Sequence, residues 1–184
     1  MHMKLRNLVA AAAAFAFIAS APASAELKAG ARAPDFAAKG ALAGKPFSFN
    51  LKDALKRGPV VLYFYPKAFT QGCTLEAHAF AEASDDFKAA GATVIGMSND
   101  KIETLQKFST EACRDKFAVA AATPQVIKSY DVALKAVGIP TGLTKRTSYV
   151  IGRDGNIVMV HSEMDYRDHV KLTLAAVRKL GGAR

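Results

Sequence analysis

Apolar residues alternate between continuous runs and helical periodicity along most of the chain. The run 59–66 is rich in β-branched and aromatic residues and predicts a strand buried on both faces. Residues 70–90 carry apolar side chains at spacings of three and four, which predicts a helix that ends at Gly91. The run 93–98 predicts a second strand, and residues 101–113 predict a second helix. This alternation predicts a largely parallel sheet with right-handed crossovers.

The two ends of the remaining chain predict simpler units. Residues 28–36 are punctuated by glycine, alanine and proline, which favours an extended arm, and a short hairpin is expected around 44–46. The runs 147–151 and 157–160 flank a glycine-containing turn and predict a hairpin, and residues 168–180 predict a closing helix. This order is typical of an α/β, thioredoxin-like fold, with a central mixed sheet flanked by helices and an N-terminal extension and hairpin.

The first 25 residues differ from the rest. Two basic residues precede an apolar run, which ends in small residues at 23–25. The run is shorter than the roughly 20 residues that span a bilayer, and the pattern is typical of a cleaved signal peptide. We therefore expect a signal peptide over 1–25, a single domain over 26–184, a periplasmic or secreted protein, and no membrane attachment after cleavage.

Charge and cysteine content exclude several classes of function. The formal net charge is +9, but the basic residues are dispersed and lack interleaved aromatic residues, so we expect a solvated surface and no nucleic-acid binding. The two cysteines, Cys73 and Cys113, form no C-x-x-C pair and have no metal-ligand spacing. We expect no metal site and no bound cofactor.

Cys73 falls in the first turn of the helix predicted to follow the buried strand. A helix N-terminus favours an anion there, and the thiolate is the nucleophilic form of cysteine. Thr70 is placed to aim its hydroxyl at the sulfur, and Pro66 is placed to turn the chain and shield the site from water. The spacing alone also fits a buried structural cysteine.

Pro66, Thr70 and Cys73 stand at the spacings Pro-x-x-x-Thr-x-x-Cys. With the residues around them they resemble the active-site motif of the peroxiredoxins of the AhpC/TSA type. The stretch 72–76 resembles the bacterioferritin-comigratory-protein (PrxQ) subfamily, and the likeness extends over about 33–160. The resemblance implies that Cys73 is the peroxidatic residue and that Thr70 binds the peroxide together with Arg146, which precedes the strand 147–151. A guanidinium there would hold the thiolate and stabilise the charge on the leaving oxygen.

The resemblance also implies a resolving thiol, which condenses with the sulfenic acid. In one pattern of the subfamily this cysteine lies five residues after the first, but His78, expected on the helix surface, occupies that position. In another variant it lies on the following helix, and Cys113 resembles it in region, though not in register. We expect the segment 111–116 to move, with Arg114 and Lys116 favouring a Cys113 thiolate. A permanent structural disulfide and a bystander thiol are the alternatives.

Four other polar residues have no assigned role. Glu76 could cap its helix or pair with Arg146, and Lys67 could add positive potential beside the site. His161 and His169 are expected on the surface.

Together these features predict a thiol peroxidase that reduces hydrogen peroxide and organic hydroperoxides through Cys73. The expected partner is a thioredoxin-like dithiol reductant, and the expected state is a monomer or weak dimer. One alternative is a peroxide-sensing or docking module that uses a Cys73–Cys113 disulfide without turnover. A thiol-disulfide oxidoreductase is disfavoured by the missing C-x-x-C.

Overall fold

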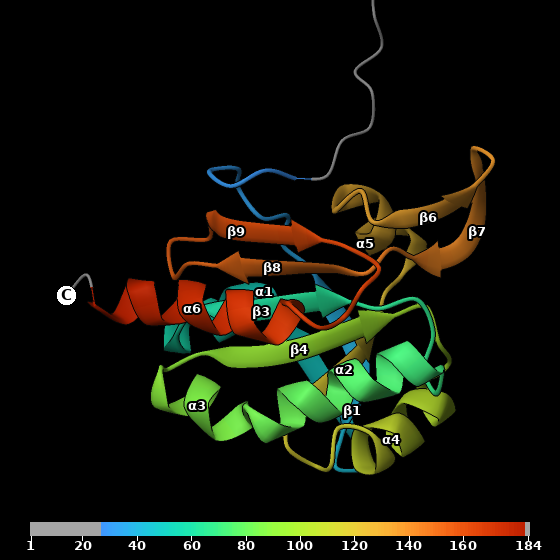
Figure 1. The fold of residues 1–184 in the computed structure, drawn as a ribbon, viewed down its shortest axis with the longest axis horizontal. Helices are drawn as coiled ribbons and strands as arrows, with labels where there is room; N and C mark the ends of the chain where they lie inside the picture. The colour runs from blue at the N-terminus through green and yellow to red at the C-terminus, as the bar shows by residue number, and fades with distance from the viewer. Residues whose placement is uncertain (1–26, 183–184) are drawn as a thin grey trace, which may run out of the picture.

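This computed structural model of the protein describes residues 27–182, so the expected signal peptide lies outside the described residues (Figure 1). The strands are β1 (Ala37–Leu42), β2 (Lys45–Asn50), β3 (Val60–Phe64), β4 (Thr93–Ser98), β5 (Ala118–Ala121), β6 (Ala133–Ala136), β7 (Ile139–Thr144), β8 (Thr147–Ile151) and β9 (Ile157–Ser162). The helices are α1 (Leu51–Arg57), α2 (Gln71–Glu82), α3 (Ser84–Ala89), α4 (Ile102–Glu111), α5 (Pro124–Ser129) and α6 (His169–Gly182).

Seven strands form one mixed sheet in the order β2-β1-β5-β4-β3-β8-β9. The central strands β3, β4 and β5 are parallel, and the outer strands are antiparallel to their neighbours. This arrangement confirms the predicted mixed sheet, the N-terminal hairpin and the hairpin of β8 and β9. Every residue of β3 is buried, as its continuously apolar run predicts.

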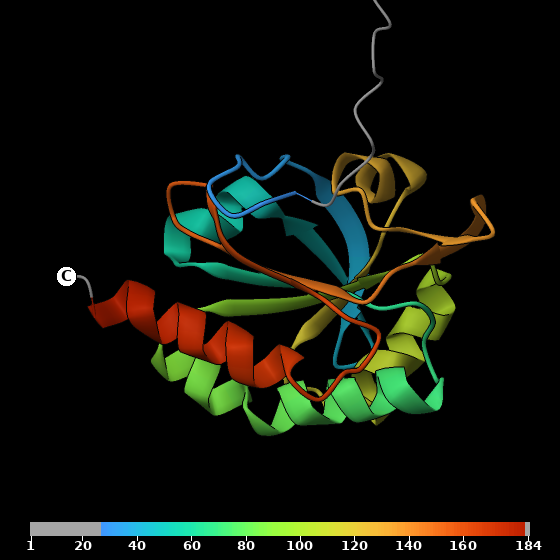
Figure 2. The ribbon, with the colours of Figure 1, turned by 45° about the horizontal axis from the view of Figure 1, so that its top comes forward.

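Helices cover both faces of the sheet (Figure 2). The helices α2, α3, α4 and α6 lie on one face, and their apolar residues join an inner face of the sheet that includes Val61 and Tyr63. The helices α1 and α5 lie on the other face, over a second core that includes Leu62 and Phe64. Alternate residues of β3 therefore supply the two cores.

The predicted helix over 70–90 is wrong in one respect, because α2 and α3 are separate helices that meet at Ala83. The sequence Ser84-Asp85-Asp86 follows, and these residue types favour the start of a helix over its interior. The predicted helix over 101–113 is also too long, since α4 ends at Glu111.

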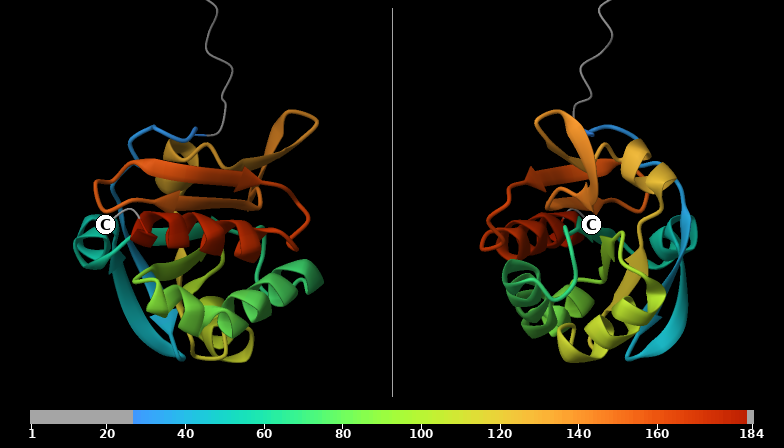
Figure 3. Two further views of the ribbon diagram at one scale, coloured as in Figure 1. Left: turned by 60° about the vertical axis from the view of Figure 1, so that its left-hand side comes forward. Right: turned by 90° about the vertical axis from the view of Figure 1, so that its right-hand side faces the viewer.

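Several elements had no clear sequence signal, among them α1, α5 and the hairpin of β6 and β7. This hairpin forms a separate two-stranded sheet and stands out at the end of the molecule where the β3–α2 loop lies (Figures 1 and 3). Asn99, in the β4–α4 loop, binds the β6–β7 hairpin, because its Nδ2 donates a hydrogen bond to the carbonyl oxygen of Gly142 at 3.0 Å. No helix within 27–182 is long and apolar enough to cross a membrane.

Candidate active site

The step from β3 to α2 places Cys73 as the sequence predicts. The strand ends at Phe64, and Cys73 is the third residue of α2, within the first helical turn. Its side chain is 1% exposed and lies in the apolar cluster between α2 and the sheet. The sulfur is therefore largely screened from water near the positive end of a helix dipole.

The loop between β3 and α2 is held in place by two polar side chains from other segments, Asp100 and Thr144. The Asp100 carboxylate accepts hydrogen bonds from the backbone N–H of Ala68, at 2.7 Å, and from Ser98 Oγ, at 2.8 Å. The Thr144 hydroxyl donates to the carbonyl oxygen of Tyr65, at 2.7 Å. These bonds connect the β3–α2 loop to the carboxyl end of β4 and to β7. The position of Cys73 therefore depends on β4 and β7 as well as on the loop itself.

Arg146 binds Cys73 through one arm of its guanidinium group. Its Nη2 donates to Cys73 Sγ at 3.4 Å, its Nη1 donates to Glu76 Oε2, and its Nε donates to the carbonyl oxygen of Met164 at 2.9 Å. A Cβ atom at Gly72 would lie 3.3 Å from Nη2, so a glycine there suits this close approach. The arginine thus connects the Cys73 sulfur to a buried acid.

Glu76 pairs with Arg146 and does not cap α2. It is fully buried, and burial raises its pKa to about 8 although the adjacent charge of Arg146 lowers it. For Arg146 burial has the opposite effect and lowers the pKa, but the negative charges of Glu76 and Cys73 outweigh burial, so the pKa of Arg146 is raised overall. Arg146 therefore stays charged, while Glu76 is poised to hold a proton.

The expectation that His169 lies on the surface is wrong. It is the first residue of α6, it is fully buried, and its Nδ1 lies 2.8 Å from Ser148 Oγ and 3.7 Å from Glu76 Oε1. Its Nε2 lies 3.0 Å from the carbonyl oxygen of Glu163. Burial lowers the pKa of His169 to about 4, so the ring is neutral at physiological pH.

Thr70 lies at the N-cap of α2, but its hydroxyl donates to the carbonyl oxygen of Lys67, at 3.0 Å. No hydrogen bond joins it to Cys73 within the described residues. Since its proton is engaged, its oxygen is left to accept a bond from a ligand. Pro66 is partly buried at the end of β3, whereas Lys67 is exposed.

Cys113 is fully buried just after α4, in the same apolar cluster as Cys73. Both thiols are free and do not lie near each other. The expectation that Arg114 and Lys116 favour its thiolate is wrong, because burial raises the pKa of Cys113 and the charge of Asp115 raises it further.

The segment 111–116, which we expect to move, contains a turn over 112–115 with two unusual backbone conformations. Arg114 and Asp115 have φ of 51° and 59°, in the left-handed region that costs a non-glycine residue about 1–2 kcal/mol. An exposed ion pair between Arg114 and Glu82, at 3.3 Å, connects this turn to the end of α2. The turn is therefore strained at the two residues that directly follow Cys113.

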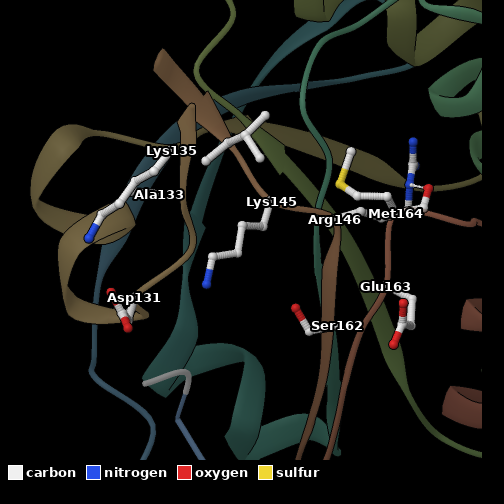
Figure 4. Close-up of a pocket in the computed structure, with 9 residues that line it drawn as sticks. Asp131, Ala133, Lys135, Lys145, Arg146, Ser162, Glu163 and Met164 are labelled. Carbon is white, nitrogen blue, oxygen red and sulfur yellow. Dashed lines mark hydrogen bonds between the residues drawn. The ribbon is translucent and has the colours of Figure 1, made fainter. Parts of the chain in front are cut away.

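A pocket of about 440 Å³ opens beside Arg146 (Figure 4). Arg146 and Met164 lie on one side of it, and Lys135 and Asp131 lie on the other. Its lining comes from the β6–β7 region and from the segment after β9.

Sequence reasoning found Cys73 and Arg146 but missed Asp100, Thr144 and His169. A signal for His169 was present, because it precedes Thr173 by four residues and Thr173 lies on the buried face of α6. Asp100 and Thr144 gave no such signal, since their partners are backbone groups brought near only by the fold.

Residues 29–160 match the AhpC/TSA family. The chain is 31% identical over 138 residues to "Peroxiredoxin Q, chloroplastic" of Sedum lineare, covering 74% of this chain and 71% of that protein. It is 32% identical over 117 residues to "Peroxiredoxin Bcp" of Escherichia coli strain K12, covering 62% and 75%.

Solved structures agree with these matches. The crystal structure of peroxidoxin BcpB from Mycobacterium tuberculosis superimposes with a TM-score of 0.74 at 31% identity, covering 84% of this chain and 98% of that one. Peroxiredoxin Q from Xanthomonas campestris shares the fold, with a TM-score of 0.67 at 24% identity, covering 78% and 90%.

Proposed function

The chain belongs to the AhpC/TSA family and is a thiol-dependent peroxidase, and from this premise we propose that Cys73 is its peroxidatic residue. The observation that carries the proposal is the bond from Arg146 Nη2 to Cys73 Sγ, at 3.4 Å, in the first turn of α2. A fixed cation beside a sulfur at a helix N-terminus stabilises the thiolate that attacks a peroxide.

The reaction at Cys73 is a two-electron reduction of the hydroperoxide. The thiolate attacks one peroxide oxygen, the S–O bond forms and the O–O bond breaks. The leaving oxygen takes a proton and departs as water or an alcohol, and Cys73 becomes a sulfenic acid. The Arg146 guanidinium offsets the negative charge that develops on the two oxygens. The Thr70 oxygen, left as an acceptor, orients the peroxide O–H.

We propose that Cys113 then resolves the sulfenic acid. Its sulfur attacks Cys73 Sγ, an S–S bond forms as the S–O bond breaks, and the hydroxyl takes up the Cys113 thiol proton and leaves as water. The two residues must first move together, because a disulfide needs Cα atoms about 4.4–6.8 Å apart. The left-handed backbone of Arg114 and Asp115 supports this movement, since unfolding the turn releases its strain.

The experiment for Cys73 is the consumption of hydrogen peroxide by residues 26–184 with dithiothreitol as the reductant. Wild type should turn over, and Cys73→Ser should be inactive because serine supplies no thiolate. Cys113→Ser is the matched control, since it removes the other buried thiol. Loss of turnover in Cys113→Ser alone, with Cys73→Ser active, would reverse the assignment.

A second experiment tests Cys113 as the resolving residue. After one equivalent of peroxide, wild type should contain an intramolecular disulfide, whereas Cys113→Ser should accumulate sulfinic acid on Cys73 under excess peroxide. Nonreducing peptide mapping measures both products. Absence of the disulfide in oxidised wild type would support a one-cysteine cycle with an external thiol.

We further propose that the protein works in the periplasm or is secreted, on the basis of the basic, apolar and small-residue pattern in 1–25. Its reductant would then be an exported dithiol protein of the thioredoxin-like kind. Expression of the full chain in a Gram-negative host, followed by fractionation and N-terminal sequencing, tests this. A cytoplasmic product that retains its first residues would contradict it.

A further inference from the structure

Glu76 shares Arg146 with Cys73, and its protonation bears on the Cys73 thiolate, an inference that rests on the proposed function. Arg146 contacts both Cys73 and Glu76 and supplies the permanent positive charge between them. If Cys73 and Glu76 were both ionised, two anions would share one guanidinium in a buried cluster. An uncompensated buried charge is costly, so one of the two must hold a proton.

Glu76 is the group whose surroundings favour the proton. Its Oε2 accepts a bond from Arg146, but its Oε1 has no hydrogen-bond partner among the described residues. The side chain is fully buried. An ionised carboxylate would leave this oxygen charged and without a donor, whereas a carboxyl group places its proton there.

The orientation of His169 explains why no donor reaches Glu76 Oε1. The Glu163 carbonyl oxygen can only accept, so His169 Nε2 carries the ring proton. In the neutral ring, Nδ1 is then an acceptor, and the Ser148 hydroxyl donates to it. With its proton on Nε2 and its Nδ1 lone pair taken by the Ser148 hydroxyl, His169 offers no hydrogen-bond donor to Oε1, 3.7 Å away, and so does not stabilise a carboxylate there.

We propose that His169 is a positioning residue that keeps Glu76 protonated, so that the charge of Arg146 is left to the Cys73 thiolate and peroxide reduction slows when Glu76 ionises. The burial-raised pKa of Glu76, about 8, and the lowered pKa of His169, about 4, agree with a proton on the acid. As the pH rises through the pKa of Glu76, its carboxylate competes for the guanidinium. The titratable or charged groups facing this pair are Cys73, Tyr63, Arg146, His161 and Asp165.

The test compares His169→Asn, Glu76→Gln and the control His78→Asn, a substitution of a partly exposed histidine on α2. The rate of Cys73 oxidation by hydrogen peroxide is measured over a pH range that brackets 8. Wild type and His78→Asn should show a fall in rate above about pH 8. In His169→Asn the amide N–H can donate to the carboxylate, so the fall should begin about one pH unit lower. The glutamine of Glu76→Gln is neutral at every pH, so the oxidation rate of this variant should not show that fall.

Infrared spectroscopy of the reduced protein gives a second readout that does not depend on activity. The stretching band of a protonated carboxyl group should be present in wild type at neutral pH, absent in Glu76→Gln, and lost at lower pH in His169→Asn. An active wild type without that band, or with a titration that His169→Asn leaves unchanged, would overturn the inference. An inactive wild type that shows the band would instead refute the peroxidase assignment of Cys73. If His169→Asn does not fold, the wild-type band and its titration still decide the charge of Glu76.

Discussion

Replacing Arg146 tests the electrostatic basis of the proposed reaction. Arg146→Ala removes the donor that lies 3.4 Å from Cys73 Sγ and the positive charge that faces the reacting oxygens. Loss of one preorganised donor to a developing oxyanion costs about 2.7–4 kcal/mol of transition-state stabilisation. The second-order rate constant for oxidation of Cys73 should therefore fall by about 10²–10³-fold.

Two further variants separate the charge of Arg146 from its geometry. Arg146→Lys keeps a positive charge but loses the fork that reaches Cys73, Glu76 and the Met164 carbonyl together. It should lose one charge-assisted hydrogen bond, about 1.5–3 kcal/mol, and slow oxidation by about 10–100-fold. Arg153→Ala, in the turn between β8 and β9, is the matched control because its partner is the exposed Lys56 carbonyl oxygen.

The assay is stopped-flow oxidation of the reduced protein by hydrogen peroxide, with circular dichroism to establish that each variant is folded. Removal of Arg146 leaves Glu76 without its partner, and Glu76 should respond by keeping its proton. A folded Arg146→Ala protein whose rate stays within about threefold of wild type would refute the reasoning, because transition-state stabilisation would then come from elsewhere.

Two other predictions concern the scaffold. Asp100→Ala leaves the Ala68 N–H without its acceptor, which should lower the free energy of unfolding by about 1–3 kcal/mol, as measured by urea unfolding. Because the β3–α2 loop would be held less firmly, kcat/KM should fall by about tenfold in steady-state kinetics. An unchanged kcat/KM would show that the loop is held by other contacts. Leu62→Ala in the fully buried strand β3 should lower the free energy of unfolding by about 2–5 kcal/mol. The control Leu172→Ala, at a side chain 38% exposed on α6, should cost less, and equal losses would contradict the placement of Leu62 in the core.

The sequence predicts the parts of this site that follow from local pattern. The run 59–66 is too apolar for an exposed strand, and the helical spacing that follows places Cys73 in a first turn. The family motif then indicates Arg146, although it lies 73 positions after Cys73 in the chain. Periodicity and motif together are therefore enough to indicate the proposed nucleophile and the cation that contacts it.

The remaining features depend on tertiary contacts that a local pattern does not encode. The carboxylate of Asp100 meets the Ala68 N–H only because β3 and β4 are adjacent in the sheet. Cys113 lies between the end of α4 at Glu111 and a left-handed turn, and this placement buries it. The polar residues around it in 111–116 give no indication of that burial in the sequence. The role of Glu76 was open in the sequence for the same reason, since its partner is fixed only by the position of Arg146 in the fold.

The most direct test of the central claim is to trap the first oxidation product in Cys113→Ser, which retains one thiol. The reduced protein is treated with one equivalent of hydrogen peroxide and a cyclic diketone that reacts with sulfenic acids, and its peptides are analysed by mass spectrometry. We predict an adduct on the Cys73 peptide that forms far faster than on free cysteine, and no adduct in Cys73→Ser. A folded protein that consumes peroxide without an adduct on Cys73, or that reacts no faster than free cysteine, would contradict Cys73 as the peroxidatic residue.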